Sequence, residues 1–466
     1  MKEYQMKKFL ITCSTLLAMS ASLPAFAEDP VGDWTGLIEG AIRLNISVTK
    51  TQSGQHQVTV ISPDQGNFTI KADKVDAGEN FMRFSIAKLN CNYEAKWDET
   101  QKAWLGTWTQ GQQAKLKLTR LDAKALAAQV KKRPQEEAIA KSPRNYSSTD
   151  VSFQNAKAKI SLAGTLTLPQ GKGPFPAVVL VHGSGPNDRD ETIKDHKIFL
   201  VLADHLSKQG IAVLRYDKRG IAASKGDYKS ATTFDFADDA QTAVDYLRTR
   251  SEINQDKLGM IGHSEGGLIA PVLAANDPKL KFIVLMAGPG IRIDALMLEQ
   301  GRLLGLANGE SQTEVEKAQK VSREAYAIMN SGADDKTISE RLTAYFDQAE
   351  KNGDLAKGAG AGQLSTLASP WFRAFIKYDP APTLAKVKQA TLVLNGELDL
   401  QVPAKMNLDG IRANMKANKN VVIKELPKLN HLFQTATNGS SAEYGKIEET
   451  LSPVALDAMS GWILQQ

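Results

Sequence analysis

The stretch Leu258-Gly259-Met260-Ile261-Gly262-His263-Ser264-Glu265-Gly266 decides the fold of this chain. A short apolar strand enters a G-x-S-x-G pattern, and the residues that follow, Gly267–Ala275, are predicted to form a helix. This strand–turn–helix arrangement is a nucleophile elbow, in which a sharp turn lifts the serine oxygen off the edge of the sheet. Side chains larger than glycine at Gly262 and Gly266 would collide with neighbouring backbone in the strained turn. The pattern therefore predicts that Ser264 is a nucleophile.

The sequence around the elbow alternates between buried strands and amphipathic helices from residue 151 onward, which is typical of an α/β fold with a mostly parallel sheet and helices on both faces. The run Ile160–Leu168 suits an antiparallel entry hairpin, and Asp195–Gln209 and Phe234–Arg250 are predicted helices. The predicted strands are Ala177–Val181, Ile211–Tyr216, Leu258–Gly262, Phe282–Met286, Thr391–Leu394 and Val421–Glu425.

One connection in this region is far longer than the others. About 100 residues separate the strand ending near Ala287 from the strand beginning at Thr391, whereas a strand–helix crossover needs far fewer. Ala318–Met329 and Ile338–Ala349 have helical patterns, and the Gly/Ala-rich stretch Gly353–Gly362 is predicted to be mobile. We expect a helical cap inserted at about 291–389 within a domain that spans 149–466.

The preceding part of the chain has a different pattern. Residues 28–121 contain short alternating strands separated by Gly, Asn and Asp, which predicts an antiparallel sandwich or small barrel. Its tryptophans, Trp34, Trp97, Trp104 and Trp108, are expected in the core rather than on a binding surface. Residues 122–148, which begin Ala- and Lys-rich and continue with Pro134 and Pro143, are interpreted as a linker.

The first residues are typical of an export signal. A basic start is followed by the apolar run Phe9–Ala21 and by Ala25-Phe26-Ala27, so residues 1–27 are predicted to be a cleaved signal peptide of a periplasmic or secreted protein. The apolar run is too short for a membrane span, which needs roughly 20 residues. Cys91 is then the one remaining thiol, and we expect it to be buried.

The charge of the chain argues against nucleic acid as a partner. Removal of residues 1–27 takes away three Lys and one Glu, so the formal net charge falls from +5 to +3, without a clustered basic run. Zinc-protease, paired-cysteine, P-loop and dinucleotide-binding motifs are also missing from the sequence, so no metal and no cofactor is expected.

A serine hydroxyl needs a base to take its proton, and in enzymes with this elbow the order along the chain is Ser, acid, His. His431 is the only histidine after Ser264, so it is the predicted base. Asp399, which follows the strand ending at Leu394, is the predicted acid that holds the imidazole. Glu397 lies on the same loop and is the rival.

The oxyanion of an acyl-transfer intermediate needs backbone N–H donors. One donor is predicted to be the N–H of Glu265, the residue after the nucleophile. The other is expected from the loop His182-Gly183-Ser184-Gly185-Pro186, which follows the strand Ala177–Val181. Ser184 is the first choice and Gly183 the second, and a plain strand–helix turn is the alternative reading of this loop.

Together, the elbow Gly262–Gly266, Asp217-Lys218-Arg219-Gly220, Asn395-Gly396-Glu397-Leu398-Asp399 and Asn430-His431 resemble bacterial α/β-hydrolase esterases. The resemblance is strongest to the subgroup with an N-terminal β-domain, which is related to dienelactone hydrolases and distantly to prolyl oligopeptidases. Gly32–Gly36, Ser62–Gly66 and Gly106–Gln110 resemble the leading domain of that subgroup. One departure is Gly220-Ile221-Ala222-Ala223-Ser224, where relatives often have a second glycine. The resemblance implies hydrolysis of carboxylic esters without a cofactor and places the triad on Ser264, Asp399 and His431.

The expected activity is therefore hydrolysis of small ester substrates, with a cap of this size favouring short or medium acyl groups. Two alternatives remain open at this point. The same triad would serve a peptidase or a thioesterase, and the chain could instead be a non-catalytic binding protein of the cell envelope whose β-domain carries the function.

Overall fold

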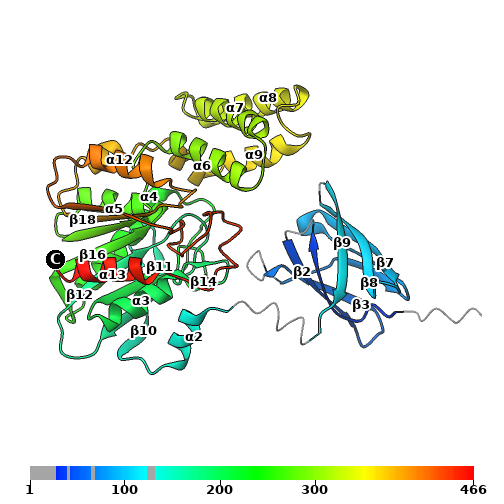
Figure 1. Cartoon of the computed structure of the whole chain (residues 1–466), viewed down its shortest axis with the longest axis horizontal. Coiled ribbons are helices and arrows are strands. Elements are labelled where there is room, and N and C mark those ends of the chain that lie inside the picture. The colour runs from blue at the N-terminus through cyan, green and yellow to red at the C-terminus, as the bar shows by residue number, and fades with distance from the viewer. Residues whose placement is uncertain (1–27, 39–41, 64–68, 111, 123–131) are drawn as a thin grey trace, which may run out of the picture. The chain divides into compact units, whose positions relative to one another are not determined.

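The computed structural model describes residues 28–38, 42–63, 69–110, 112–122 and 132–466 (Figure 1). The predicted signal peptide 1–27 lies outside the described residues. The chain divides into two compact units, Met1–Val130 and Lys131–Gln466, which we call the N-terminal unit and the catalytic unit.

The described residues of the N-terminal unit form one antiparallel nine-stranded sheet in the order β4-β3-β2-β1-β9-β8-β7-β6-β5. The sheet curls until β3 and β5 come into contact, so the fold is a partly closed barrel rather than two packed sheets. Its strands are β1 (Gly32–Ile38), β2 (Ile42–Lys50), β3 (His56–Ile61), β4 (Thr69–Lys71), β5 (Lys74–Gly78), β6 (Phe81–Ile86), β7 (Cys91–Asp98), β8 (Ala103–Gln110) and β9 (Gln112–Arg120).

Tryptophans fill the concave side of this sheet, as predicted. Trp34 and Trp104 have no exposed surface, and with Trp97 they form a cluster of edge-to-face rings whose centroids are 5.3–5.8 Å apart. Trp108 and Cys91 are also buried, and burial raises the pKa of the Cys91 thiol. Trp34, Trp104, Trp108 and Cys91 therefore stabilise the N-terminal unit from its core, and Trp97 packs half-buried against them.

The catalytic unit is built on an eight-stranded sheet in the order β10-β11-β15-β12-β16-β17-β18-β19. The first two strands form an antiparallel hairpin that pairs antiparallel with β15, and all later pairs are parallel. The six predicted strands and the entry hairpin are confirmed. Their bounds are β10 (Tyr146–Asn155), β11 (Ile160–Pro169), β12 (Phe175–Val181), β15 (Ala212–Tyr216), β16 (Ile253–His263), β17 (Phe282–Met286), β18 (Ala390–Gly396) and β19 (Val421–Leu426).

Helices cover both faces of this sheet and separate two apolar cores. One core holds α3 and α13, and the other holds α4, α5 and α12. Thr232 caps the N-terminus of α4 through a capping box with Asp235. The helices are α3 (Ile198–Lys208), α4 (Thr233–Arg248), α5 (Glu265–Asn276), α11 (Ala381–Leu384), α12 (Ala404–Asn414) and α13 (Pro453–Ile463).

Between β17 and β18 lies the predicted cap, whose helices gather at one end of the catalytic unit (Figure 1). The glycine-rich stretch Gly353–Gly362 contains the start of α9, and its N-cap Gly358 has a positive φ of 81°, a conformation that glycine accepts readily. The cap helices are α6 (Ile293–Ala307), α7 (Gln312–Met329), α8 (Asp335–Lys351), α9 (Ala359–Leu367) and α10 (Pro370–Ile376).

Part of the predicted linker 122–148 belongs to the catalytic unit. Residues 123–131 lie outside the described residues, but Pro134 occupies the first turn of helix α2 (Pro134–Lys141) and does not break the chain. The Arg133 guanidinium donates to the carbonyls of Lys194, Gly445 and Ile447, and Gln135 bonds the backbone of Leu451. Residues 133–148 of the predicted linker therefore form part of the catalytic unit.

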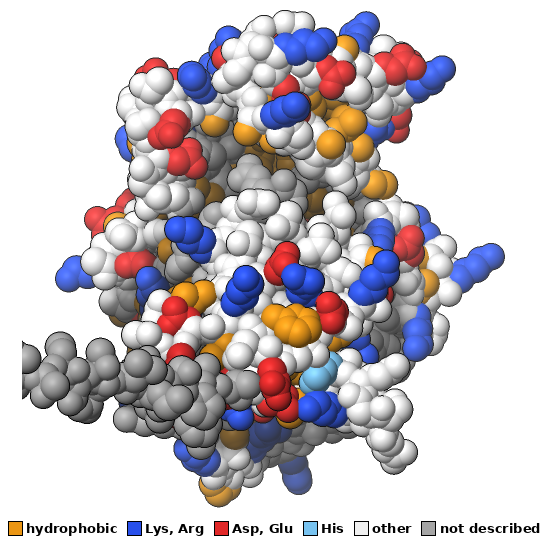
Figure 2. Space-filling view, turned by 90° about the vertical axis from the view of Figure 1, so that its right-hand side faces the viewer, with side chains coloured by type: hydrophobic (Ala, Val, Ile, Leu, Met, Phe, Trp, Pro, Cys, Tyr) orange, Lys and Arg blue, Asp and Glu red, His pale blue; other side chains and the backbone are white. Residues whose placement is uncertain are grey.

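Basic and acidic side chains are interspersed on the face shown in Figure 2, and neither sign forms a continuous patch among the described residues there. Across the described ranges, no helix combines the length and the hydropathy that crossing a bilayer requires.

Candidate active site

Ser264 lies in a strained turn between β16 and α5. Its φ of 53° and ψ of −114° fall outside the common regions for a residue with a side chain, as a nucleophile elbow requires. A Cβ at Gly262 would lie 2.0 Å from the carbonyl oxygen of Gly266, and a Cβ at Gly266 would lie 2.1 Å from that of Val181. Both glycines are therefore required by the close approach of backbone around Ser264.

The predicted base and acid meet Ser264 at the carboxyl edge of the sheet. His431 follows β19, and its Nε2 lies 3.1 Å from Ser264 Oγ. Its Nδ1 donates to Asp399 Oδ2 over 2.8 Å. The Asp399 carboxylate is buried after β18, and its other oxygen accepts the N–H groups of Gln401 and Val402, each over 2.8 Å. These bonds hold the carboxylate and the imidazole in line with the serine hydroxyl.

Glu397, the rival acid, points elsewhere. Its side chain is exposed and accepts the backbone N–H of Lys428 over 2.9 Å. The structure therefore brings Asp399, and not Glu397, to His431.

The predicted oxyanion donors differ in their availability. Within the described residues, the N–H groups of Ser184 and Glu265 donate to no protein acceptor. The N–H of Gly183 instead donates to Oε1 of the buried Glu191 over 2.5 Å, so Gly183 is not a free donor, contrary to our second choice. The loop does lie at the nucleophile, because a Cβ at Gly183 would be 3.1 Å from the Ser264 Cβ.

A second imidazole–carboxylate pair, His263 and Glu191, lies next to the nucleophile and was not predicted from the sequence. His263 Nδ1 is 3.1 Å from Glu191 Oε1, and His263 Nε2 donates to the carbonyl oxygen of His431 over 3.0 Å. Burial alone would lower the pKa of His263, but the charge of Glu191 and the bonds to Glu191 and His431 raise it overall. Burial would likewise raise the pKa of Glu191, and the charge of His263 makes the net shift downward. Both shifts favour the charged forms of the two side chains, and the pair links the loops that carry Glu191, His263 and His431.

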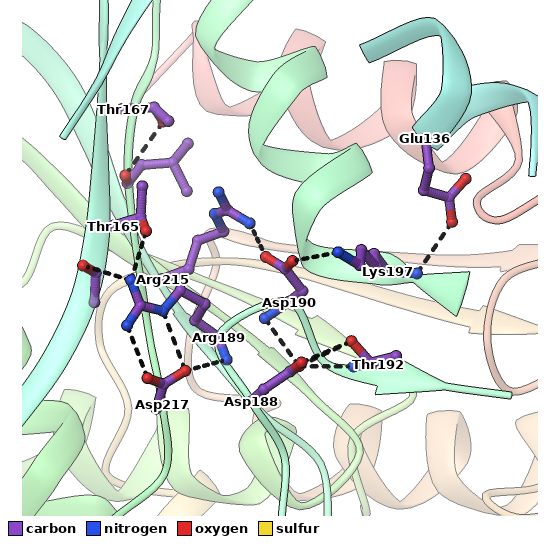
Figure 3. Close-up of polar contacts among 12 residues, drawn as sticks. Glu136, Thr165, Thr167, Asp188, Arg189, Asp190, Thr192, Lys197, Arg215 and Asp217 are labelled. Carbon is purple, nitrogen blue, oxygen red and sulfur yellow. Dashed lines mark hydrogen bonds and ion pairs between the residues drawn. The ribbon is translucent and has the colours of Figure 1, made fainter. Parts of the chain in front are cut away.

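A network of ion pairs fixes the segment that carries Glu191 (Figure 3). Arg189 donates to both oxygens of the buried Asp217, over 3.1 and 2.8 Å. Asp190 lies between Arg215, which donates to it, and Lys197, whose Nζ is 3.6 Å away. Arg215 belongs to β15 and Asp217 directly follows that strand, so the two guanidinium groups hold the loop against the sheet, in addition to the bonds that Asp188 accepts within the loop.

The network continues to helix α2 and across the hairpin of β13 (Thr192–Ile193) and β14 (His196–Lys197). Glu136 accepts the N–H of Lys197 over 3.1 Å and the hydroxyl of Thr450 over 2.6 Å. Thr450 also contacts the buried His196 over 2.7 Å. The described part of the predicted linker thus supports the loops beside Ser264.

The stretch Asp217-Lys218-Arg219, one of the segments that carry the family resemblance, forms ion pairs at each position. Asp217 binds Arg189, and Arg219 donates to Asp239 over 2.6 Å. Lys218 reaches the elbow itself, where its Nζ is 3.2 Å from Glu265 Oε2. No signal in one sequence would have revealed that partner, since the two residues are far apart along the chain.

The described ranges contain no group of three or more His, Cys, Asp and Glu side chains that could hold a metal ion. The geometry around Ser264 is that of an activated serine with an adjacent base, and it suits acyl transfer.

The chain is similar in sequence to known hydrolases. Esterase EstD of Thermotoga maritima is 28% identical over 327 residues, which cover 69% of each chain. The putative hydrolase YtaP of Bacillus subtilis is 30% identical over 129 residues, or 24% of this chain and less than half, 43%, of that relative.

Two solved structures are also similar. The Pyrococcus furiosus esterase Pf2001 matches 69% of this chain and 91% of its own at 16% identity, with a TM-score of 0.44. Est1E from Butyrivibrio proteoclasticus, solved with ferulic acid, matches 68% and 98% at 17% identity, with a TM-score of 0.41.

The resemblance to α/β-hydrolases with an N-terminal β-domain is confirmed, since the sheet order, the elbow and a separate antiparallel unit are all present. The profile of the X-Pro dipeptidyl-peptidase (S15 family) matches residues 158–423, more than half of the chain. The chain therefore belongs to the S15 family of hydrolases and has the α/β-hydrolase fold.

Proposed function

We propose that this protein hydrolyses carboxylic esters through an acyl-enzyme intermediate on Ser264, with His431 as the base and Asp399 as the acid. The observation that carries the proposal is the line of contacts through His431, from Asp399 Oδ2 at 2.8 Å to Ser264 Oγ at 3.1 Å. A serine hydroxyl becomes a useful nucleophile only when a base in this position takes its proton.

The reaction follows from these contacts. Ser264 Oγ attacks the ester carbonyl and passes its proton to His431 Nε2, while Asp399 stabilises the imidazolium that forms. The N–H groups of Glu265 and Ser184 bind the oxyanion. His431 then gives the proton to the leaving alcohol, and a water molecule, deprotonated by His431, attacks the acyl-enzyme and releases the acid.

The carboxylates near Ser264 are already bound to other groups of the protein, which favours an ester substrate over a peptide bound by its free amino terminus. Glu191 binds Gly183 and His263, whereas Asp399 binds His431 and two backbone N–H groups. Glu265 accepts from Thr233, Trp371 and Lys218. A dipeptidyl-peptidase needs an anionic group for the substrate's α-ammonium, and none of these three carboxylates is available for it.

The cap supports a further detail, a bounded pocket that favours short or medium acyl groups. Its helices α6–α10 are inserted after β17, the strand that lies between β16, which leads to the nucleophile, and β18, which precedes the acid. A series of 4-nitrophenyl esters with increasing acyl length tests this, and we expect kcat/KM to fall for long chains. A rate that rises steadily with acyl length would contradict the bounded pocket.

Peptide hydrolysis is the second candidate, because the family profile is that of an X-Pro dipeptidyl-peptidase. The purified protein should turn over nitrophenyl esters and leave Xaa-Pro nitroanilides intact, and Ser264→Ala should abolish both turnover and labelling by a fluorophosphonate. Turnover of the nitroanilides alone would replace the ester proposal by the peptidase. Full activity of Ser264→Ala would reject the nucleophile and revive a binding role.

We also propose export to the periplasm or beyond, on the basis of the basic start, the apolar run and the Ala25-Phe26-Ala27 site. The mature protein should begin at Glu28 when its mass is measured after expression in a bacterium with a secretion pathway. An intact N-terminus on protein from the cytoplasmic fraction would contradict this proposal.

A further inference from the structure

The peptide bond between Gly183 and Ser184 is fixed from one side by buried donors. Its carbonyl oxygen accepts Lys218 Nζ over 2.7 Å and Asn187 Nδ2 over 2.9 Å. A trans peptide points its C=O and N–H in opposite directions, and this bond is not among the cis bonds of the chain. The Ser184 N–H therefore points away from Lys218, on a loop whose Gly183 packs against Ser264.

The Lys218 ammonium is held in place by more than this carbonyl. Its side chain is 3% exposed, its Nζ is 3.2 Å from Glu265 Oε2, and it stands 4.3 Å from the centre of the Phe236 ring. A buried ammonium is tolerated only when paired and hydrogen-bonded, and these three neighbours match its three N–H groups. The positive charge also polarises the carbonyl of Gly183, which strengthens the N–H at the other end of the same peptide group.

Glu265 connects Lys218 to the cap. Its side chain is fully buried, and Oε1 accepts the Thr233 hydroxyl over 2.6 Å and the Trp371 indole N–H over 2.7 Å. Trp371 belongs to α10 of the cap and stacks on Phe375, with centroids 5.0 Å apart. The backbone N–H of Glu265 is the other predicted oxyanion donor, so one residue joins the cap, the elbow and Lys218.

We propose that Lys218 and Glu265 are positioning residues that orient the Gly183–Ser184 peptide, so that its N–H faces the oxyanion formed at Ser264, and that Trp371 ties this arrangement to the cap. The inference rests on the proposed function, because an oxyanion forms only if Ser264 attacks a carbonyl. Neither side chain touches the substrate, and both act through the backbone of the oxyanion loop.

The test compares an ester with the corresponding thionoester, in which sulfur replaces the carbonyl oxygen. Sulfur accepts hydrogen bonds weakly, so the preference for the ester measures how well the N–H donors are placed. The variant is the double change Lys218→Met with Glu265→Gln, which removes both charges at once and leaves no buried ion without a partner. We expect kcat for the ester to fall about 10- to 100-fold, KM to change little, and the ester preference to shrink.

The matched control is the double change Arg219→Met with Asp239→Asn. It removes the adjacent buried ion pair, which has no bond to Gly183 or Glu265 in the described residues. We expect a lower unfolding temperature for this control and an unchanged ester preference. A purely structural role for Lys218 would make the two double variants behave alike.

Trp371→Phe gives an independent reading if the first double variant does not fold. It keeps an aromatic ring in the cap but removes the N–H that Glu265 accepts, together with part of the indole, and we expect a fall of about threefold in kcat and a smaller ester preference. An ester preference equal to that of the wild type in Trp371→Phe, or in the folded double variant, would overturn the inference. If the wild-type protein did not hydrolyse esters, or if Ser264→Ala hydrolysed them at the wild-type rate, the proposed function itself would be rejected.

Discussion

Two imidazole–carboxylate pairs flank Ser264, and they differ in what the second ring nitrogen faces. In His431–Asp399 the second nitrogen is 3.1 Å from a hydroxyl, which can give up a proton. In His263–Glu191 it is 3.0 Å from the carbonyl oxygen of His431, which can only accept one. The first pair can therefore act as a base, whereas the second must remain a donor on both sides and serves as a fixed support.

The carboxylates differ in the same way. Asp399 accepts two backbone N–H groups of its own loop as well as His431, so it holds the imidazole from one side of the site. Glu191 accepts the N–H of Gly183, which belongs to the oxyanion loop, as well as contacting His263. The His431–Asp399 pair thus takes part in the reaction, whereas the His263–Glu191 pair joins the oxyanion loop to the nucleophile elbow.

The largest expected difference between the pairs is in the histidines. His431→Gln should lower kcat for an ester by about 10⁵-fold or more, because loss of the base leaves only binding and the oxyanion donors. His263→Gln should lower it by about 10-fold, since a glutamine amide can still donate to the carbonyl of His431. Single-turnover rates with a nitrophenyl ester measure both, and equal losses would refute the division of roles.

The carboxylates should show a smaller contrast. Asp399→Asn should lower kcat by about 10⁴-fold, because an amide that donates to Nδ1 favours the wrong tautomer of His431. Glu191→Gln should have a loss nearer 10-fold, because Gly183 keeps an acceptor there while the charge on His263 loses its partner. Steady-state kinetics at matched protein folding, monitored by circular dichroism, separates the two. If Glu191→Gln were the more damaging change, Glu191 would be the catalytic acid.

Gly183→Ala probes the contact between the two pairs. The new Cβ would lie 3.1 Å from the Ser264 Cβ and 3.2 Å from Glu191 Oε1, so one pair must shift by a few tenths of an ångström. We expect kcat to fall roughly threefold to tenfold with little loss of stability. Gly362→Ala is the control, because a Cβ there meets nothing within 4 Å. A wild-type kcat for Gly183→Ala would show that the loop can move without cost.

The smallest expected effect is on stability at different pH. The folded-state pKa of His263 is raised above its unfolded value, so its stabilising contribution is complete below about pH 6.5 and is lost as pH rises through the folded pKa. His263→Gln should therefore destabilise the protein more at pH 6 than at pH 10. Urea unfolding at the two pH values measures this, and an equal loss at both would mean that His263 is neutral in the folded state.

Much of the fold was predictable because its signals are local. The parallel strands are short apolar runs, and Ser264 stands in a motif whose strand and helix are visible in the sequence. His431 followed by elimination, and Asp399 followed from its place at a strand end. The cap was predictable from the length of one connection alone.

The rest depends on contacts that bring together distant parts of the chain. The sequence predicted Gly183 as an oxyanion donor, but in the structure its N–H donates to Glu191. The sequence likewise contains no signal that pairs Lys218 with Glu265. A proline such as Pro134 occurs both in linkers and in the first turn of helices, so the sequence alone does not distinguish the two. The hydrogen bonds of Arg133 and Gln135 to the catalytic unit show that this segment is a helix fixed to that unit. Hydrogen bonds between residues far apart in the chain produce no periodic pattern in the sequence, so they cannot be predicted from it.

Once residues 1–27 are absent, Cys91 is the only thiol of the chain, and it lies on β7 with 2% of its surface exposed. A thiol reagent can then react with Cys91 only when the N-terminal unit opens, so the rate of labelling measures how often this unit opens. Since the thiol is remote in sequence from Ser264, the same sample can be timed by an alkylating agent and by ester turnover. The natural protein therefore carries its own probe for whether the two units lose their structure together or one at a time.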